Sequence, residues 1–254
     1  MKKLPISAVI ITRDEESNIS RCLSSLRFCD ELIVIDSGST DKTVEVARTF
    51  TPIVRQRDWT GYSDQKTFAN SLAKNDWILS VDADEEVSSE LETELSLLVN
   101  KGLQDTAYSI PRRTYHFGKW IRFGGWYPNR LVRFFDRTKG NWEEKDVHEF
   151  WHARGSVGII RQPLNHYSFK SLSDQVIRND NYSTLGATHL LKAGGRSSLL
   201  KLVTKPASKF IETYLVKLGF LDGYPGFLIS VSAAYSVFLK WAKLWELQHV
   251  TQQD

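Results

Sequence analysis

The chain has 254 residues, of which 41% are hydrophobic, and this is enough for a sizeable core in one large domain or in one domain with an appended module. Its formal net charge of +3 is modest, so electrostatics do not indicate a nucleic-acid-binding protein. No low-complexity segment points to disorder.

The two cysteines, Cys22 and Cys29, are spaced in a way that indicates no zinc site and favours a reduced, cytosolic chain. The first residues lead directly into a predicted strand and lack the apolar core and cleavage site of a signal peptide. The longest nearly apolar run, residues 227–239, contains three serines and is too short to cross a bilayer comfortably. We therefore expect a cytoplasmic protein.

The first 84 residues alternate between strand and helix patterns. Strands are predicted at residues 6–12, 31–36, 53–54 and 77–81. The helix before the fourth strand, residues 63–73, carries Phe68, Ala69 and Leu72, which we expect to face the core. The alternation is typical of βαβ units, which implies parallel strands joined by right-handed crossovers.

The pattern changes after residue 84. An amphipathic helix is predicted over residues 88–99, and short aromatic-rich strands with Gly and Pro breaks follow from about residue 107 to 167. From residue 171 the chain is predicted to be helical. We expect an α/β fold with a mixed central sheet over residues 1–170, followed by a helical extension over residues 171–254.

Polar residues follow three of the predicted strands. They are Thr12 and Glu15 after the first strand, Asp36 after the second, and Asp82 and Asp84 after the fourth. The carboxyl ends of parallel strands meet at one edge of a sheet, where ligands collect. Asp82 and Asp84 are two residues apart, so an extended chain points both carboxylates to the same side. Because like charges held close repel each other unless a cation bridges them, we predict a Mg²⁺ or Mn²⁺ site there.

Simpler structural roles stay open for these residues. The acidic segment can form a solvated turn that opens the next helix, and residues 39–41 can cap the helix that follows them. The first strand is followed by no GxGxxG motif, and the chain has no Walker-type GK[ST] motif, which counts against a nicotinamide or a P-loop nucleotide. A nucleotide held through a metal on its diphosphate fits these residues better.

Four blocks of the sequence resemble, in order and spacing, those of the family 2 inverting glycosyltransferases. The blocks are residues 10–15 (IITRDE), residues 34–41 (VIDSGSTD), Gln65 and Lys66 with Asn70, and residues 82–85 (DADE). The resemblance covers roughly residues 5–170. With residues 126–128 (WYP) and 147–149 (VHE), the chain is most similar to bacterial glucosyltransferases that extend the lipopolysaccharide inner core. Asp14 departs from the pattern, since many relatives carry Asn there, and we expect little consequence.

This resemblance implies a Rossmann-like, nucleotide-sugar-binding fold known as GT-A. It implies that the nucleoside and diphosphate are held by Thr12, Glu15, Asp36 and Lys66, and that ribose and metal are handled by Asp82 and Asp84, which form a DXD motif. Arg130 and Arg133 are further candidates for the diphosphate, because guanidinium groups pair well with phosphate oxygens. Surface salt bridges are the alternative for both arginines.

Inversion at the anomeric carbon of a sugar requires a general base that takes the proton of the acceptor hydroxyl. We predict Glu149 for this role, because its family position fits and it is flanked by His148 and Phe150. Asp146 is the second candidate, and an exposed loop of solvated acids is the structural alternative. Trp126 and Tyr127 fit either a surface that stacks on a sugar or a packed hairpin.

Residues 199–217 form a basic amphipathic pattern with an expected break at Pro206, and a second helix is predicted from about residue 227 to 247. Basic and aromatic residues in such helices are typical of a membrane interface, and a helical hairpin packed on protein is the alternative. We favour the inner leaflet of the bacterial inner membrane, because the expected acceptor is anchored to a lipid.

The sequence therefore predicts an inverting, metal-dependent hexosyltransferase that moves a sugar, expected to be glucose, from a UDP-sugar to a membrane-anchored glycan. A nucleotidyltransferase that makes an activated sugar would open with a Gly-rich phosphate loop, which residues 12–16 do not form. A non-catalytic sugar-binding module would lack the carboxylates that are present here. The sequence defines neither the acceptor hydroxyl nor the oligomeric state.

Overall fold

The computed structural model describes residues 3–145, 148–169 and 171–250. The chain forms two compact units. The first unit comprises residues 1–113 and 129–167, and the second comprises residues 114–128 and 168–254. The expected division into a catalytic domain, residues 1–170, and a helical extension, residues 171–254, stays a prediction.

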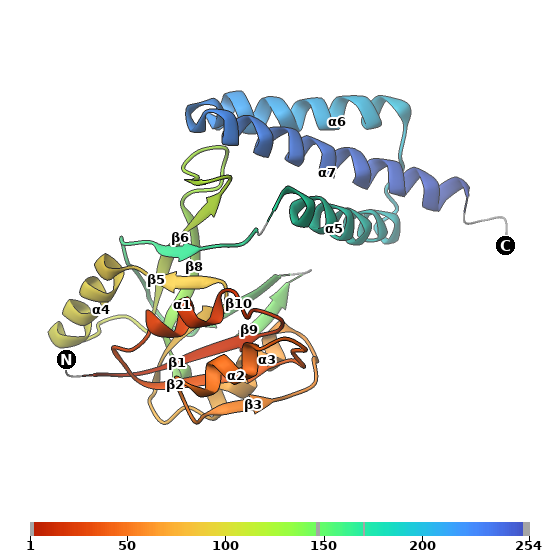
Figure 1. Ribbon diagram of the computed structural model, residues 1–254. Coiled ribbons are helices and arrows are strands. Elements are labelled where there is room, and N and C mark those ends of the chain that lie inside the picture. The colour runs from red at the N-terminus through yellow and green to blue at the C-terminus, as the bar shows by residue number, and fades with distance from the viewer. Residues whose placement is uncertain (1–2, 146–147, 170, 251–254) are drawn as a thin grey trace. The chain divides into compact units, whose positions relative to one another are not determined.

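One half of the sheet in the first unit is parallel (Figure 1). Its strands are β1 (Leu4–Thr12), β2 (Cys29–Asp36), β3 (Val54–Gln56) and β4 (Trp77–Asp82), in the spatial order β3-β2-β1-β4. Each neighbouring pair in this half runs parallel. Every residue of β1 from Ile6 to Ile10 is buried. This fits its apolar, partly β-branched sequence, which is typical of a strand covered on both faces.

Within the described residues, four helices connect or follow these parallel strands. They are α1 (Ile19–Ser24), α2 (Thr43–Arg48), α3 (Tyr62–Ser71) and α4 (Ser89–Lys101). α4 begins at a cap: the hydroxyl of Ser88 accepts a hydrogen bond from the backbone N–H of Leu91 at 3.2 Å. Leu91 and Leu95 then turn its apolar face into the core.

The inner face of α3 matches its prediction in part. Ala69 is buried and Phe68 packs against the smaller core cluster, as expected, but Leu72 is 37% exposed. The other buried residues of the helix are the polar Gln65, Lys66 and Asn70. The apolar pattern was misleading because α3 turns an ammonium and two amides inward, toward charged and polar partners.

Beyond β4 the sheet continues with strands that pair mostly antiparallel. These are β8 (Asn129–Asp136), β6 (Ala107–His116), β12 (Leu164–His166) and β5 (Glu85–Val87), in the order β4-β8-β6-β12-β5, and β11 (Val157–Ile159) pairs parallel with β6. The short η1 (Arg137–Lys139) leads into a separate hairpin of β9 (Gly140–Lys145) and β10 (His148–Ala153). The predicted α/β class with a mixed sheet is confirmed.

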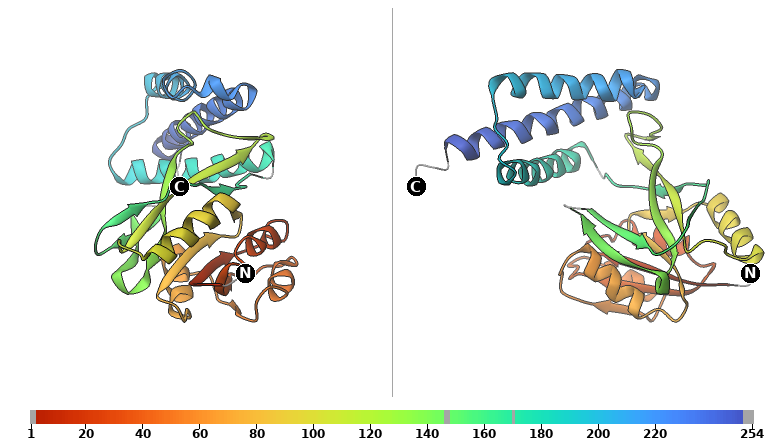
Figure 2. Two further views of the ribbon diagram at one scale, coloured as in Figure 1. Left: turned by 90° about the vertical axis from the view of Figure 1, so that its left-hand side faces the viewer. Right: turned by 180° about the vertical axis from the view of Figure 1, so that it is seen from behind.

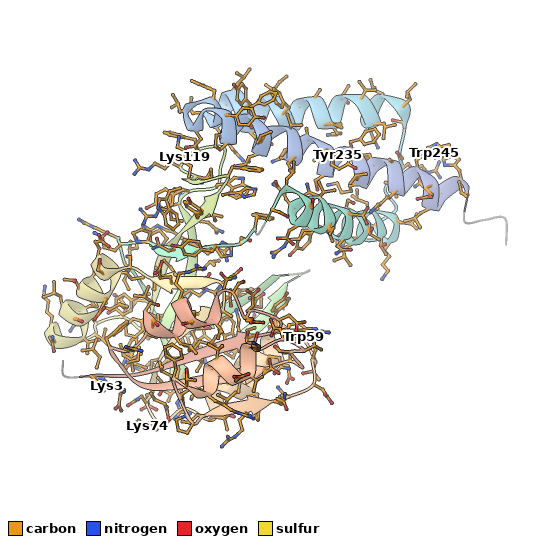
Figure 3. The ribbon with its side chains drawn as sticks, viewed as in Figure 1. Lys3, Trp59, Lys74, Lys119, Tyr235 and Trp245 are labelled. Atoms are coloured by element: carbon orange, nitrogen blue, oxygen red, sulfur yellow. The ribbon has the colours of Figure 1, made fainter. Side chains whose placement is uncertain are left out.

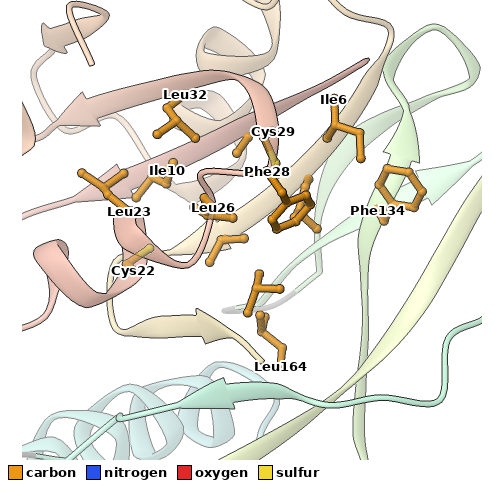
Figure 4. Packing of buried hydrophobic residues seen from close by; sticks show 14 of the residues in the cluster. Ile6, Ile10, Cys22, Leu23, Leu26, Phe28, Cys29, Leu32, Phe134 and Leu164 are labelled. Carbon is orange, nitrogen blue, oxygen red and sulfur yellow. The ribbon is translucent and has the colours of Figure 1, made fainter. Parts of the chain in front are cut away.

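Two clusters of buried hydrophobic residues form the core of the first unit. The larger includes Ile10, Leu23 and Phe134, whose packing Figure 4 shows. The smaller includes Val9, Trp142 and Trp151. Val9 and Ile10 belong to different clusters because successive side chains of a strand face opposite sides of the sheet. The hairpin β9–β10 is thus fixed by its tryptophans against the smaller cluster.

The second unit is mainly helical, as predicted. Its elements are β7 (Lys119–Trp120), which pairs with the end of β6, then α5 (Leu172–Lys192), α6 (Leu199–Ile211), the π-helical turn η2 (Glu212–Val216), η3 (Gly219–Asp222) and α7 (Tyr224–His249). Figure 2 shows α6 and α7 side by side, and α7 also packs on α5. The expected break at Pro206 is wrong: α6 continues through it to Ile211. Proline removes one hydrogen bond of the helix, and packing along α7 offsets that loss.

Candidate active site

The carboxyl ends of β1, β2 and β4 lie side by side at one edge of the sheet. Thr12 is in register with Asp36, and Ile11 is in register with Asp82. The parallel topology therefore brings together three of the residues that were expected to meet there. The ligand roles predicted for them stay predictions.

Asp36 shapes the turn that follows β2. Its Oδ2 accepts hydrogen bonds from the backbone N–H groups of Gly38 and Ser39, each at 3.0 Å, and its Oδ1 accepts one from the Ser39 hydroxyl. Gly38 has a φ of 86°, which residues with a Cβ rarely adopt, and open space lies where its Cβ would be. Asp36 is fully buried, so these hydrogen bonds commit its carboxylate to the turn.

The loops after β1 and β2 hold each other in place. The backbone N–H of Asp14 donates to the Ser39 hydroxyl at 2.9 Å, and that of Thr40 donates to Oδ1 of Asp14 at 2.8 Å. The backbone N–H of Glu15 donates to the Thr43 hydroxyl at 2.8 Å. Asp14 has a φ of 52°, in the left-handed region that Asn and Asp adopt more readily than other side chains. This conformation suits Asp as well as the Asn of many relatives.

A network of six charged side chains lies at the end of β4. Each comes from a different element, three are basic and three are acidic, and the six are Lys66, Arg112, Arg133, Asp82, Glu85 and Glu149. Because the two signs are equal in number, the formal charges of the network cancel. A buried charge is costly unless it is paired, and this arrangement supplies a partner for each.

Arg133 of β8 is the centre of the network. Its guanidinium donates to both carboxylate oxygens of Asp82, with Nη1 3.3 Å from Oδ1, and its Nη2 is 3.2 Å from Oε1 of Glu85. The fully buried Glu85 uses its other oxygen to accept from the backbone N–H of Asp82 at 2.9 Å, and Arg112 lies 3.3 Å from Oε1. The diphosphate role predicted for Arg133 stays a prediction, and its contacts with carboxylates are those of the salt-bridge alternative.

The pKa values of Asp82 and Arg133 follow from the attraction between their opposite charges. Burial alone would raise the pKa of Asp82, but the charges of Arg133 and Lys66 outweigh it and hold that pKa well below its usual range. Burial alone would lower the pKa of Arg133, and the charges of Asp82 and Glu85 raise it above its usual value. Asp82 is therefore ionised in the folded protein at neutral pH.

Glu149 joins the network from β10. Its Oε1 lies 2.8 Å from Nζ of Lys66, and the same Nζ lies 3.1 Å from Oδ1 of Asp82. Trp151 is two residues further along the strand and so shares its face, and its ring stacks on Phe135 with centroids 3.9 Å apart. Glu149 thus lies on a strand, with its side chain only 19% exposed, rather than in a solvated loop. The second candidate, Asp146, lies outside the described residues.

Asp84 has different surroundings from Asp82. Its Oδ2 lies 3.3 Å from Nε2 of His166, which is the last residue of β12. Burial alone would raise the pKa of Asp84, but the hydrogen bond and the charge of His166 outweigh it and lower that pKa. The acidic segment does not open a helix: β4 ends at Asp82 and β5 begins at Glu85.

Of the two predicted metal ligands, Asp82 and Asp84, the surroundings of Asp84 suit a metal ion better. Both oxygens of Asp82 already accept from Arg133 or Lys66, whereas Asp84 is next to an imidazole, and carboxylate with imidazole is a donor set that divalent cations accept. No group of three or more His, Cys, Asp and Glu residues forms a metal cage within the described ranges. Mg²⁺ is commonly held by one or two carboxylates, with water and substrate phosphates in the rest of its shell, and the single carboxylate of Asp84 is compatible with this.

Other predicted residues lie in varied places. The Oγ1 of Thr12 is buried and has no hydrogen-bond partner among the described residues, while a carboxylate oxygen of Glu15 accepts from the Asn18 amide at 2.7 Å. Arg130 donates to the backbone carbonyl of Ile160 at 3.0 Å, which is a structural contact. Trp126 belongs to the second unit and stacks parallel to His116, which supports the packed-hairpin alternative.

Three residues of the site were missed in the sequence: Glu85, Arg112 and His166. Glu85 sits beside the DXD motif, but an acid that ends up fully buried has no local signature. Arg112 lies on the long strand β6 and His166 on the short strand β12, and the partners of both are distant in sequence. The sequence contained only a weak signal for Arg112 and His166, because each is a polar residue within an otherwise strand-like segment.

A cavity of about 210 Å³ lies between α3 and the hairpin β9–β10. Its lining includes Asn70, Arg137, Trp142 and Trp151, and none of the predicted site residues contributes to it. The cavity is therefore separate from the charge network, although Trp142 contacts both.

Comparison with known proteins gives matches over most of the chain. Residues 7–162 match the family model described as "Glycosyl transferase family 2". A Rickettsia felis protein named "Uncharacterized glycosyltransferase" is 35% identical over 95% of this chain and 89% of its own length. The "Lipopolysaccharide core biosynthesis glycosyltransferase LpsC" of Rhizobium meliloti is 31% identical over 96% of this chain and 93% of its own length.

Among solved structures, the chain is similar to the mannosyltransferase PcManGT of Pyrobaculum calidifontis, which was crystallised with GDP-Man and Mn²⁺. The TM-score is 0.55, and the match covers 96% of this chain and 88% of that one at 12% identity. At this identity the likeness concerns the fold, and it confirms the predicted GT-A class.

Proposed function

Because the chain belongs to glycosyltransferase family 2, we propose that it is an inverting, metal-dependent enzyme that transfers a sugar, glucose in the first instance, from a UDP-sugar to a membrane-anchored glycan. The observation that carries this proposal is the meeting of Thr12, Asp36 and Asp82 at adjacent strand ends, with Asp84 and Glu149 beside them. Ligands of open α/β sheets bind at such an edge.

The donor nucleotide would bind along β1 and β2. The buried Oγ1 of Thr12 lacks a partner among the described residues, and a buried hydroxyl of this kind is commonly satisfied by a ligand or water. Asp36 stays the predicted partner of the nucleoside: its buried carboxylate shapes the turn at Gly38, and the bare backbone there allows close approach. Glu15 lies in the adjoining loop.

A Mg²⁺ or Mn²⁺ ion would be held by Asp84 with His166, and when bound it would offset the negative charge that develops on the leaving diphosphate. Asp82 acts differently in this proposal: its ion pairs with Arg133 and Lys66 fix the end of β4 and so the position of the turn that carries Asp84. The metal-bound neighbour PcManGT is consistent with divalent metal use in this fold.

Glu149 would act as the general base. Its Oε1 is bound by Lys66, and no described residue hydrogen-bonds to its Oε2, which leaves that oxygen to take the proton of an acceptor hydroxyl. The deprotonated hydroxyl attacks the anomeric carbon from the face opposite the diphosphate, so a new glycosidic bond forms as the bond to the diphosphate breaks. The configuration at that carbon is inverted.

The acceptor is inferred from the relative of Rhizobium meliloti, whose name places it in lipopolysaccharide core biosynthesis. We infer a lipid-linked glycan such as the lipopolysaccharide inner core, and a cytoplasmic enzyme at the inner face of the inner membrane. Family membership does not favour the two alternatives, a nucleotidyltransferase or a non-catalytic sugar-binding module.

The surface of α6 supports the membrane part of the proposal. No residue of α6 is buried, and Leu199, Leu200, Val203 and Ile211 are each between 50% and 77% exposed. At 100° per residue these four side chains fall within about 120° of the helix circumference, so they form one apolar strip. Lys201, Lys205 and Lys209 lie on the opposite side, which leaves the apolar strip as the main lipid-binding element.

Helix α7 also exposes two aromatic side chains, Tyr235 and Trp245 (Figure 3). By length and composition α7 is able to cross a membrane. It has 26 residues, and its most apolar 18-residue stretch has a mean hydropathy of 1.3 and is only 17% buried. It is longer than the apolar run seen in the sequence. Because it packs along α5 and α6, we infer that it lies at the interface with them.

The test is a screen of UDP- and GDP-sugars for hydrolysis with Mn²⁺ and with EDTA, repeated on Asp84→Ala and on Asp76→Ala, an exposed acid, as the matched control. The expected result is slow hydrolysis of one UDP-sugar that requires metal, that Asp84→Ala abolishes and that Asp76→Ala retains. Equal rates in EDTA would contradict metal dependence, and hydrolysis of a GDP-sugar alone would contradict the UDP donor.

A further inference from the structure

The side chain of Lys66 joins three different elements. Its Nζ lies 2.8 Å from Oε1 of Glu149 on β10 and 3.1 Å from Oδ1 of Asp82 on β4. The ring of Trp142 on β9 is 4.9 Å from the same atom, within the range of a cation–π contact. The side chain is only 2% exposed, so the ammonium group has exchanged its water for these partners.

Two of the three protons of this ammonium group have carboxylate acceptors, and the ring of Trp142 lies beside the group. Because the side chain is only 2% exposed, a phosphate oxygen would have to displace one of these neighbours to reach Nζ. The family resemblance implied that Lys66 binds the diphosphate. Its contacts differ from those of a lysine whose ammonium group is open to a phosphate.

We propose that Lys66 is the residue that positions the catalytic base, and that it links the base to the donor end of β4. The inference rests on the proposed function, because it takes Glu149 as the base. A carboxylate can rotate about its side-chain bonds, and a hydrogen bond to Oε1 restricts that rotation so that Oε2 points in one direction. Lys66 holds Glu149 in the way that a third group orients the base of a nucleophilic triad.

The residues around Lys66 fix its contact with Glu149. Lys66 lies in the middle of α3, and Asn70, one turn later, accepts from Nε1 of Trp142 at 3.1 Å when its amide is oriented to satisfy both neighbours. Asp82 is in turn held by Arg133. The position of Glu149 therefore depends on the end of β4, where the donor is proposed to bind, and a misplacement of about 1 Å is enough to cost a hundredfold in rate.

The experiment compares the full-length wild type with Lys66→Met, Lys66→Arg and the control Lys74→Met, each with the donor identified by the hydrolysis screen. Lys74 is an exposed lysine (Figure 3), and its Nζ is 2.9 Å from a carboxylate oxygen of Asp30. Donor affinity is measured by calorimetry, transfer by kcat and KM, and folding by thermal unfolding. Lys66→Arg keeps the charge and is used alone if Lys66→Met does not fold.

The expected result for Lys66→Met is a fall in transfer kcat of about 100-fold, with the donor Kd within about twofold of wild type. Lys66→Arg should recover part of kcat, and Lys74→Met should match the wild type. A tenfold or larger loss of donor affinity with unchanged kcat would overturn the inference and assign Lys66 to the diphosphate. Unchanged kcat in both Lys66 variants would also overturn it. A wild type without activity on any nucleotide sugar would instead contradict the proposed function.

Discussion

The Nε2 atom of His166 lies 3.3 Å from Oδ2 of Asp84, although the two residues are far apart in the sequence of the first unit. β12 pairs antiparallel with β5, and His166 is in register with Glu85, the residue after Asp84. This pairing is what places an imidazole beside the second acid of the DXD motif.

His166→Ala should weaken metal use while leaving the fold intact. We expect the Mn²⁺ concentration for half-maximal donor hydrolysis to rise by at least about tenfold, because His166 is one of the two side chains proposed to hold the ion. The measurement is a Mn²⁺ titration of activity, with the exposed His189→Ala as control. An unchanged Mn²⁺ requirement would remove His166 from the site.

Glu149→Gln should retain the donor and lose transfer. Glutamine keeps the shape of the side chain but accepts no proton, so kcat should fall by a factor of about 10²–10⁴ while the donor Kd from calorimetry stays near wild type. Glu143→Gln, on the same hairpin with a side chain that is 45% exposed, is the control. Normal transfer by Glu149→Gln would place the base elsewhere, with Asp146 as the next residue to test.

Arg133→Met should destabilise the first unit. The substitution leaves the fully buried Glu85 and its neighbour Asp82 without their main cation, and loss of one partner of a buried ion pair costs about 3–5 kcal/mol. Urea unfolding should show this loss, and the double variant Arg133→Met with Glu85→Gln should recover part of it. Arg137→Met, which breaks a more exposed pair with Asp76, should cost less than about 1 kcal/mol.

Acid should remove the contribution of Asp82 to stability. The folded pKa of Asp82 is depressed, so its contribution is fully present above the unfolded value of about 3.9 and is lost as the pH falls below it. The difference in unfolding free energy between wild type and Asp82→Asn should therefore be large at pH 7 and shrink below about pH 4. A difference that stays constant from pH 7 to pH 3 would show that the ion pairs of Asp82 contribute nothing.

The apolar strip of α6 should control membrane binding. Replacing Leu199, Leu200 and Val203 with serine removes roughly 1 kcal/mol of lipid contact per side chain, which predicts about 100-fold weaker partition into vesicles that contain anionic lipid. Flotation with these vesicles measures the effect, and Leu97→Ser, at an exposed leucine of α4, is the control. Equal partition of the triple variant would favour the packed-hairpin alternative.

The sequence by itself determined the parallel half of the fold and the residues at its strand ends. Apolar runs that end in Thr12, Asp36 and Asp82 are local patterns, and the direction of parallel strands then requires these ends to share one edge. The helical nature of the C-terminal region was readable for the same reason, because helical periodicity is also local.

The tertiary structure alone decided which charges meet. Lys66, whose role at the diphosphate stays a prediction, bridges Asp82 and Glu149, and Asp84 has His166 as a partner that no motif had indicated. The physical reason is that each member of the charge network comes from a different helix or strand. Their contacts depend on the order of the strands and on how α3 and the hairpin pack on the sheet, and the spacing of residues along the chain contains neither.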